Sequence, residues 1–398
     1  MYLLTNPWLH YAWGSVDLLP TLLHQRPDGR PVAEIWMGAH SALPSSIEID
    51  GQDVGLDDFI ERSPQLALGT QIVKGSGTHL AFMMKLLAAG QPLSLQVHPT
   101  RGQAEEGYRR EEAAGIRLND PTRNYRDSEH KPEMLYALTK FDMMCGFRPA
   151  GVIRELLAGL DVVELGSLCE SLADADPEVA LRSALTELLT ADAGRQQLLT
   201  RAVVGSARAH SEQRPEYRLV GELAEHYPGD IGLVASLFLN YLQLVPGESV
   251  FVGAGVIHSY LRGLGLELMA TSDNVLRAGL TSKHVDVPEV LRVVTFTPSE
   301  PEHLQPVRSG SASIFNPPVP DFALWTYTPS SATDFGTLVT LAGPPAGARI
   351  AVCCAGHCTL VCHDERLVLQ PGQAAFVLDA DGPVEISATG TVAVAYTP

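Results

Sequence analysis

The sequence has few basic residues and lacks any long apolar segment. Its 398 residues include 28 Lys and Arg against 46 Asp and Glu, and its formal net charge is −18 at pH 7. Such a chain has no surplus of positive charge for a phosphate backbone, so we expect no nucleic-acid partner. No run of about 18 apolar residues occurs, so we expect no contact with a membrane through a spanning helix. A small anionic substrate would have to meet a local cluster of cations.

The first residues also lack the basic segment and the apolar core of a secretory leader. We therefore expect a cytoplasmic protein whose cysteines stay reduced. Four of the six cysteines lie close together, at Cys353, Cys354, Cys358 and Cys362. They alternate with apolar residues in two expected strands around Gly356, and their spacing matches no pair of Cys-x2-Cys units. We predict that they pack in a core and bind no metal.

The order of sequence patterns predicts a mainly β protein with a helical insertion. Short alternating runs broken by Gly, Pro and Asp favour strands at residues 45–50, 71–74 and 92–97, with helices near 56–62 and 103–114. From 150 to 243 apolar residues recur at helical spacing, the last of them at Val234, Leu237, Phe238, Tyr241 and Leu242. This block is predicted to be an α-helical domain.

A weak internal repeat follows the helical block. Pro246-Gly247-Glu248 and Pro371-Gly372-Gln373 each precede two small or apolar residues and Phe-Val, and each resembles the Pro-Gly turn of a cupin jelly roll. Pro383 stands in the second copy where His258 stands in the first, so we expect the second copy to be structural. With a linker near 295–306, we predict three domains. They are a catalytic cupin barrel (1–149 with 244–300), the helical domain (150–243) and a C-terminal cupin-like barrel (301–398).

Gln96 and His98 form the first candidate metal-binding pair. They alternate with Leu95 and Val97, so in a strand both point to one face, roughly 6–7 Å apart along the chain. Alone, such a pair is more often a polar strand face than a site. Glu133 and His258 are candidates for the missing ligands, because two imidazoles, a carboxylate and an amide suit zinc and leave the ion positively charged.

A second segment, from 265 to 283, is dense in charged and amide side chains. Arg277 lies in it between Ser272-Asp273-Asn274 and Ala278-Gly279, where local hydrogen bonds would hold it. The plain alternative is a surface loop with a salt bridge.

Six phrases in order resemble type I mannose-6-phosphate isomerases, which belong to the cupin superfamily. They are Trp13-Gly14-Ser15, Glu34–His40, Lys85–Pro99, His130–Met134, Phe141–Pro149 and Ser272–Gly279. The resemblance covers about residues 1 to 295. It implies a zinc site at Gln96, His98, Glu133 and His258, a catalytic Arg277, and reversible interconversion of mannose 6-phosphate and fructose 6-phosphate. Ser41 and Ser282 depart from a frequent Pro, and neither is a proposed ligand.

An aldose–ketose isomerisation moves a proton between C1 and C2 through an enediolate, so it needs a base and a positive field. Arg277 suits the field but is a poor base. The candidates for the base are Lys131, Glu267 and His130. Lys131 is slightly favoured because a nearby zinc ion would favour its neutral amine. Ser94, Lys85 and Lys283 are candidates for binding the phosphate group.

Two other readings remain open. In the first, the chain is another cupin sugar-phosphate isomerase or epimerase. In the second, it is a non-catalytic cupin that binds sugar and whose metal only supports the structure. An iron dioxygenase is disfavoured by the amide ligand. We expect one zinc ion per chain, a small sugar phosphate as the binding partner, and a monomer.

Overall fold

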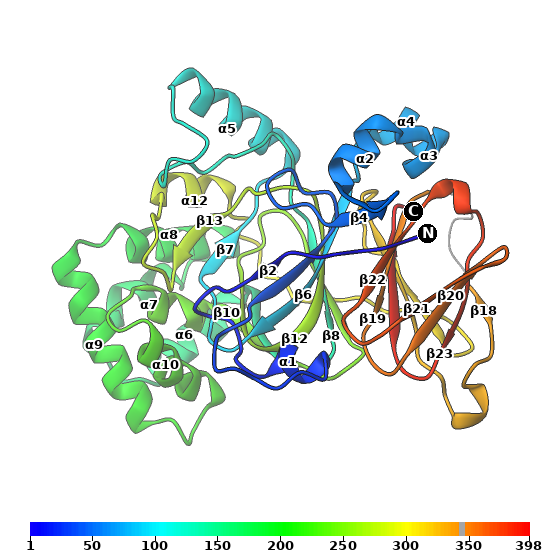
Figure 1. Ribbon diagram of the computed structural model, residues 1–398. Coiled ribbons are helices and arrows are strands. Elements are labelled where there is room, and N and C mark those ends of the chain that lie inside the picture. Colours follow the sequence, from blue (N-terminus) through cyan, green and yellow to red (C-terminus); the bar gives the residue numbers. More distant parts are fainter. Residues whose placement is uncertain (342–346) are drawn as a thin grey trace.

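The computed structural model describes residues 1–341 and 347–398, and most of them lie in β-sheets flanked by a helical lobe (Figure 1). The largest sheet has two layers that share one long strand, β12 (His258–Ala270). The first layer runs in the order β14 (Glu302–His303), β11 (Ser249–Val252), β8 (Glu133–Ala137), β12, β6 (Phe82–Ala89), β3 (Glu34–Met37), β2 (Trp8–Leu9). The second layer contains β10 (Leu239–Leu244), β9 (Phe141–Phe147), the start of β12, β7 (Leu95–Val97) and β13 (Leu276–Gly279).

Strand β12 passes from one layer to the other at Gly263. Its first residues pair with β9 and β7, and its residues from Gly263 onward pair with β6 and β8. Gly263 has φ +132, and a Cβ there would lie 2.7 Å from the carbonyl oxygen of Lys140. Only glycine fits this close approach, and the bend brings the two layers together around a shared interior.

The C-terminal region forms two further sheets, seen on the right of Figure 1. One runs in the order β1 (Tyr2–Leu3), β22 (Ala374–Val377), β19 (Arg349–Cys353), β24 (Val392–Tyr396), β17 (Ala323–Tyr327), β16 (Ala312–Phe315), β15 (Val307–Ser309). The other runs β18 (Val339–Thr340), β23 (Glu385–Ala388), β20 (Cys358–Cys362), β21 (Glu365–Leu369). Strand β1 is the N-terminus of the chain, so the two ends of the sequence meet in one sheet.

The mainly β fold with a helical insertion is confirmed; the strand pairings of residues 1–341 and 347–398 close no hydrogen-bonded ring, so the expected jelly-roll barrels consist of layered sheets. A hydrophobic core joins the first layer of the large sheet to the C-terminal sheet, with Leu86 and Leu266 on one side and Ile350 and Phe376 on the other. The prediction that these cysteines pack in a core is confirmed, because Cys353, Cys354, Cys358 and Cys362 are buried. Three of them pack in the core between the two C-terminal sheets.

The helical lobe follows β9. It contains α6 (Ala150–Ala158), α7 (Gly166–Ser171), α8 (Pro177–Thr190), α9 (Ala193–Ala209), α10 (Pro215–His226) and α11 (Gly232–Ala235). Its apolar stripes form a core with β7 and β13, so the lobe covers the second layer of the large sheet. Among the described residues, no helix combines the length and the apolar character needed to cross a membrane.

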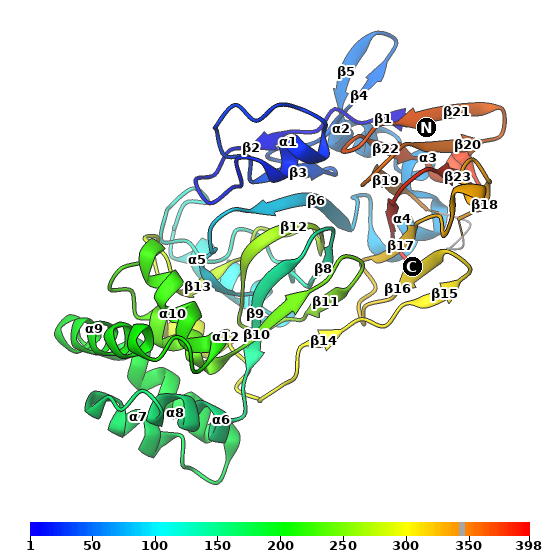
Figure 2. The same cartoon turned by 90° about the horizontal axis from the view of Figure 1, so that it is seen from below.

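The remaining helices and one hairpin lie outside the three sheets and the helical lobe described above. They are α1 (Leu18–Leu22), the hairpin β4 (Ser46–Ile49) and β5 (Gln52–Gly55), α2 (Leu56–Arg62), α3 (Pro64–Leu68), α4 (Thr70–Ser76), α5 (Arg101–Ala113) and α12 (Val287–Val293). The hairpin projects from the molecule in Figure 2. Helix α2 has the bounds expected from the sequence. Helix α5 begins two residues earlier than expected, at a capping box formed by Thr100 and Gln103.

Two expected elements were wrong. The predicted strand at 71–74 is the helix α4, bounded by Gly69 and Gly77 at positive φ, from which Ile72 and Val73 pack on the shared core. A run of four residues is too short for its period to distinguish a strand from a helix. The expected helical end at Tyr241 and Leu242 is the strand β10, whose successive side chains enter two different cores.

Candidate active site

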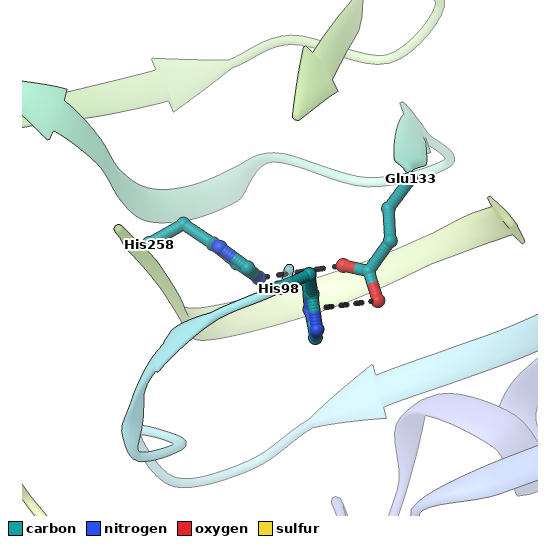
Figure 3. A group of neighbouring side chains, drawn as sticks. All are labelled: His98, Glu133 and His258. Atoms are coloured by element: carbon teal, nitrogen blue, oxygen red, sulfur yellow. Dashed lines mark ion pairs between the residues drawn. The ribbon is translucent and has the colours of Figure 1, made fainter. Parts of the chain in front are cut away.

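Three side chains from three strands meet in the interior of the large sheet (Figure 3). Glu133 begins β8, His258 begins β12, and His98 follows β7. His98 Nε2 lies 3.2 Å from Glu133 Oε1, and His258 Nε2 lies 3.3 Å from Glu133 Oε2. All three side chains are at least nine-tenths buried. One ligand atom from each lies within 4.8 Å of the other two, which is the spacing of a metal-binding group.

The hydrogen bonds of the two imidazoles fix which nitrogen carries the proton. His98 Nδ1 lies 2.7 Å from the carbonyl oxygen of Asn274, and His258 Nδ1 lies 3.1 Å from that of Val256. A carbonyl only accepts, so both Nδ1 atoms donate and both Nε2 atoms are free to bind a metal.

Burial lowers the pKa of His98 to about 4, so this ring is neutral near pH 7. Its Nε2 is buried and has no hydrogen-bond partner among the described residues. Burial raises the pKa of Glu133, but the charge of Lys131 is the largest of the opposing causes, and together they hold that pKa well below its ordinary value. Imidazole lone pairs aimed at an ionised carboxylate repel it unless a cation lies between them. The residues present therefore fit a zinc-type cation.

Gln96 joins this cluster to Arg277. In β7 it pairs with His258 of β12 on one side and with Arg277 of β13 on the other. Residues paired across neighbouring strands point to the same face. The row His258–Gln96–Arg277 therefore faces one space, and the role of Gln96 as a ligand stays a prediction.

That space is a cavity of about 440 Å³. Its lining includes eight residues singled out from the sequence, namely Lys85, Gln96, Lys131, Glu133, His258, Glu267, Arg277 and Lys283. The lining residues that were not assigned a role from the sequence include Tyr11, Trp13, Glu34, Trp36, His40, Arg126 and Asp273. A polar pocket of this size is typical of a small-molecule site.

Lys85 lies in the pocket but is not free to bind a phosphate group. Its Nζ lies 2.8 Å from Glu267 and 3.5 Å from Glu34. Burial lowers the pKa of Lys85, but the charges of Glu267 and Glu34 outweigh it and raise that pKa. The charge of Lys85 is therefore already balanced by two carboxylates.

The structure does not bring His130 to the pocket. Lys131 lines the pocket with its Nζ 3.0 Å from Glu133 Oε1, whereas His130 Nε2 lies 3.1 Å from Asp321 in the C-terminal region. Neighbouring side chains in an extended segment point to opposite sides, so only one of the two faces the pocket. Ser94 lines an adjoining hollow of about 340 Å³ that shares Arg277 and Lys283 with the main pocket.

A His40–Asp273 pair was missed by the sequence reading. His40 Nδ1 accepts the backbone N–H of Ala42, so His40 Nε2 carries the proton and donates to Asp273 Oδ2 at 3.2 Å. Burial raises the pKa of Asp273, but the bond from His40 outweighs it and lowers that pKa. Both residues lie in phrases noted in the sequence. That they meet is decided by the fold, because they are more than 200 positions apart.

A buried His–Glu–His group open to a polar pocket is typical of metal-dependent enzymes. Residues 1–150 match the family model of the catalytic domain of phosphomannose isomerase type I. The whole chain is 38% identical to mannose-6-phosphate isomerase of Salmonella typhimurium, covering 100% of this chain and 99% of that protein. It is 34% identical to the enzyme of Homo sapiens, covering 82% of each. The chain belongs to the mannose-6-phosphate isomerase family, type I.

Solved structures agree with this assignment. A crystal structure of zinc-bound mannose 6-phosphate isomerase superposes with a TM-score of 0.90 at 35% identity, covering 100% of this chain and 99% of the other. A variant of phosphomannose isomerase from Salmonella typhimurium gives a TM-score of 0.92 at 36% identity, with the same coverage. The similarity extends through the helical lobe and the C-terminal sheets, where the sequence resemblance was thin.

Proposed function

We propose that this protein interconverts D-mannose 6-phosphate and D-fructose 6-phosphate with one zinc ion held by His98, Glu133 and His258. The observation that carries the proposal is the pair of Nε2 atoms facing an ionised carboxylate on the wall of the pocket. Gln96 is proposed as a fourth, neutral ligand because it pairs with His258 in the sheet. When bound, zinc supplies positive charge that polarises the sugar oxygens.

Arg277 supplies the second part of the positive field. Its side chain projects into the same space as Gln96 and has no ion-pair partner among the described residues. A guanidinium stays charged at working pH, so Arg277 can stabilise the oxyanion of an enediolate. It is not proposed as the base.

Lys131 is proposed to move the proton between C1 and C2. Its side chain is buried at the pocket wall, with one carboxylate contact, to Glu133. Glu267 is the alternative, since burial raises the pKa of this carboxyl toward the range useful for proton transfer. Its bond to Lys85 makes it the less available of the two. Asp273, oriented by His40, is proposed to accept hydrogen bonds from sugar hydroxyls.

The phosphate group is proposed to bind where the main pocket meets the adjoining hollow. Lys283 and Arg277 line both spaces, and Ser94 lines the hollow. Neither cation has a carboxylate partner in the described parts of the chain. A phosphate there would meet positive charge, whereas Glu34, Glu133 and Glu267 line the main pocket and not the hollow.

We propose the division into a catalytic unit (1–149 with 244–300), a helical domain (150–243) and a C-terminal domain (301–398). It is supported by the pocket, whose lining residues all come from the catalytic unit. One chain thus supplies the whole site, which supports a monomer as the working form. Six free cysteines support a reducing compartment such as the cytoplasm.

The test is a coupled assay with mannose 6-phosphate, run on the protein as purified, after chelation, and after zinc is restored. We expect turnover that chelation abolishes and zinc recovers. Turnover that survives complete removal of metal would contradict the zinc proposal. Zinc binding without any turnover would favour the non-catalytic sugar-binding reading, and preference for another phosphosugar would favour an isomerase or epimerase of different specificity.

A further inference from the structure

Three cations that line the pocket form no ion pair with a carboxylate in the described parts of the chain. Lys85 and Lys131 each lie close to a glutamate, but Arg126, Arg277 and Lys283 have no ion pair and no side-chain hydrogen bond in residues 1–341 and 347–398.

The three charges are close enough to affect one another. Burial, followed by the charges of Arg277 and Arg126, lowers the pKa of Lys283. Burial, followed by the charge of Arg126, lowers the pKa of Arg277. Like charges held together cost free energy unless an anion binds between them. Arg126 therefore lies in the same positively charged part of the pocket as Arg277 and Lys283, two residues that the sequence had already indicated.

Asn274 holds the backbone at Arg126 from one side. Its side-chain oxygen accepts the N–H of Arg126 at 2.8 Å, and its amide nitrogen donates to the carbonyl of Asp127 at 2.9 Å. Asn274 is fully buried. Its own carbonyl accepts from His98 Nδ1. One residue thus fixes both the candidate metal ligand and the loop that carries Arg126.

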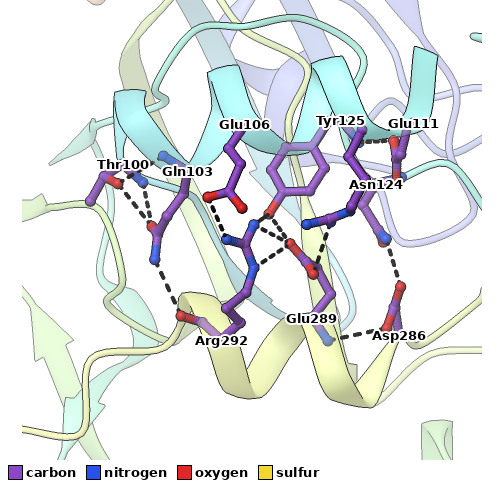
Figure 4. Close-up of polar contacts among 10 residues, drawn as sticks. Thr100, Gln103, Glu106, Glu111, Asn124, Tyr125, Asp286, Glu289 and Arg292 are labelled. Carbon is purple, nitrogen blue, oxygen red and sulfur yellow. Dashed lines mark hydrogen bonds and ion pairs between the residues drawn. The ribbon is translucent and has the colours of Figure 1, made fainter. Parts of the chain in front are cut away.

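Helices α5 and α12 hold the same segment from the other side (Figure 4). The carboxylate of Glu111 in α5 accepts the N–H groups of Asn124 and Tyr125 at 3.1 and 2.9 Å. Asn124 donates to Asp286 at 2.8 Å, and the hydroxyl of Tyr125 donates to Glu289 at the start of α12. The two residues before Arg126 are therefore anchored by three carboxylates.

Gly107 makes this anchoring possible. It lies in α5 against the ring of Tyr125, and a Cβ at this position would overlap ring atoms of Tyr125. Gly102 lies in the same helix, and a Cβ there would meet nothing within 4 Å. The two glycines therefore form a matched pair, one in contact with the Arg126 segment and one not.

We propose that Arg126 is a specificity-determining residue that binds the phosphate group of the substrate beside Lys283, and that the α5–α12 network and Asn274 position it. The inference rests on the proposed isomerase function. Arg126 acts on binding, because it lies at the exposed side of the pocket, whereas the candidate metal cluster is buried. Its guanidinium can form two hydrogen bonds to one phosphate.

The first test compares Arg126→Gln with Arg109→Gln, which removes a charge from an exposed part of α5 outside the pocket. Losing a charge-assisted hydrogen bond should raise KM for mannose 6-phosphate about ten-fold or more, with a much smaller change in kcat. Inhibition by inorganic phosphate should weaken by a similar factor, and Arg126→Lys should recover part of both. Arg109→Gln should change neither.

The second test compares Gly107→Ala with Gly102→Ala. We expect the first to raise KM and weaken phosphate inhibition in the same direction as Arg126→Gln, and the second to match the original protein. If Arg126→Gln is active with unchanged KM and unchanged phosphate inhibition, the inference is overturned. If the original protein does not turn over mannose 6-phosphate, the proposed function fails instead, and phosphate binding measured directly by calorimetry still decides whether Arg126 binds the anion.

Discussion

Lys85 and Glu267 lie directly opposite each other on β6 and β12, with Lys85 Nζ 2.8 Å from Glu267 Oε2. Trp36 is the partner of Lys85 on the other side, and its ring lies 5.2 Å from the same Nζ. Both charges are buried, and Glu34 adds a second carboxylate. The pair is a fixed part of the pocket wall. Lys85, which the sequence suggested for phosphate binding, is therefore already bound to two carboxylates.

We predict that Lys85→Met lowers the free energy of unfolding by about 3–5 kcal/mol, because it leaves Glu267 and Glu34 buried without a partner. Replacing Glu267 by Gln in the same chain should recover part of the loss. Urea unfolding measures both. Arg30→Met breaks an exposed pair with Asp28 and is the control, with a much smaller change expected. Equal losses in Lys85→Met and the control would contradict the assignment.

We predict that His98→Ala and Glu133→Gln each lose zinc as well as activity. Each removes a ligand from a site that has few others, and Glu133 also brings the only negative charge of the proposed set. Zinc content after dialysis is the measurement. His130→Ala is the matched control, because its imidazole lies outside the pocket against Asp321, and it should retain zinc. If all three variants retained zinc, the metal centre would not lie at His98, Glu133 and His258.

We predict that Arg277→Gln lowers kcat by about 10²–10³-fold while zinc content stays the same. The loss corresponds to removing one group that stabilises charge in the transition state. Steady-state kinetics and metal analysis on the same preparation separate this effect from loss of the metal. An unchanged kcat in a folded, zinc-containing variant would show that the positive field comes from elsewhere.

The buried thiols predict a loss of stability at high pH. Burial raises the pKa of Cys145 and of Cys358 to about 12 and that of Cys353 to about 11, from an ordinary value of 9.0. Between pH 9 and these values only the unfolded chain releases the protons. The contribution of these protonated thiols to the free energy of unfolding is therefore complete below pH 9 and decreases as the pH rises toward 11–12.

Urea midpoints at pH 8 and pH 10 test this expectation, with Cys353→Ala as a variant that should show a shallower decrease. A thiol reagent at pH 8 should react quickly with the half-buried Cys169 and slowly with the five buried cysteines until the protein unfolds. Rapid reaction of all six thiols in the folded protein would contradict their burial.

Much of the site could be predicted because its residues lie in short phrases with strong local character. Gln96 and His98 are two positions apart in a strand, and Glu133 follows Lys131 in one extended segment. The cysteine cluster alternated with apolar residues, and α2 had acidic residues in its first turn and a basic residue in its last. In each case the informative contact or period lies within a few residues, so the sequence carries it directly.

What the sequence by itself determined is therefore the family, the candidate metal-binding residues and the β character of the scaffold. Only the tertiary structure decided that Lys85 is paired with Glu267, that His130 points to Asp321, and that Arg126 enters the pocket. It also decided that residues 71–74 are helical. These outcomes depend on contacts between residues far apart in the chain, and on which side of a strand or loop faces the interior. Local spacing does not record either of them.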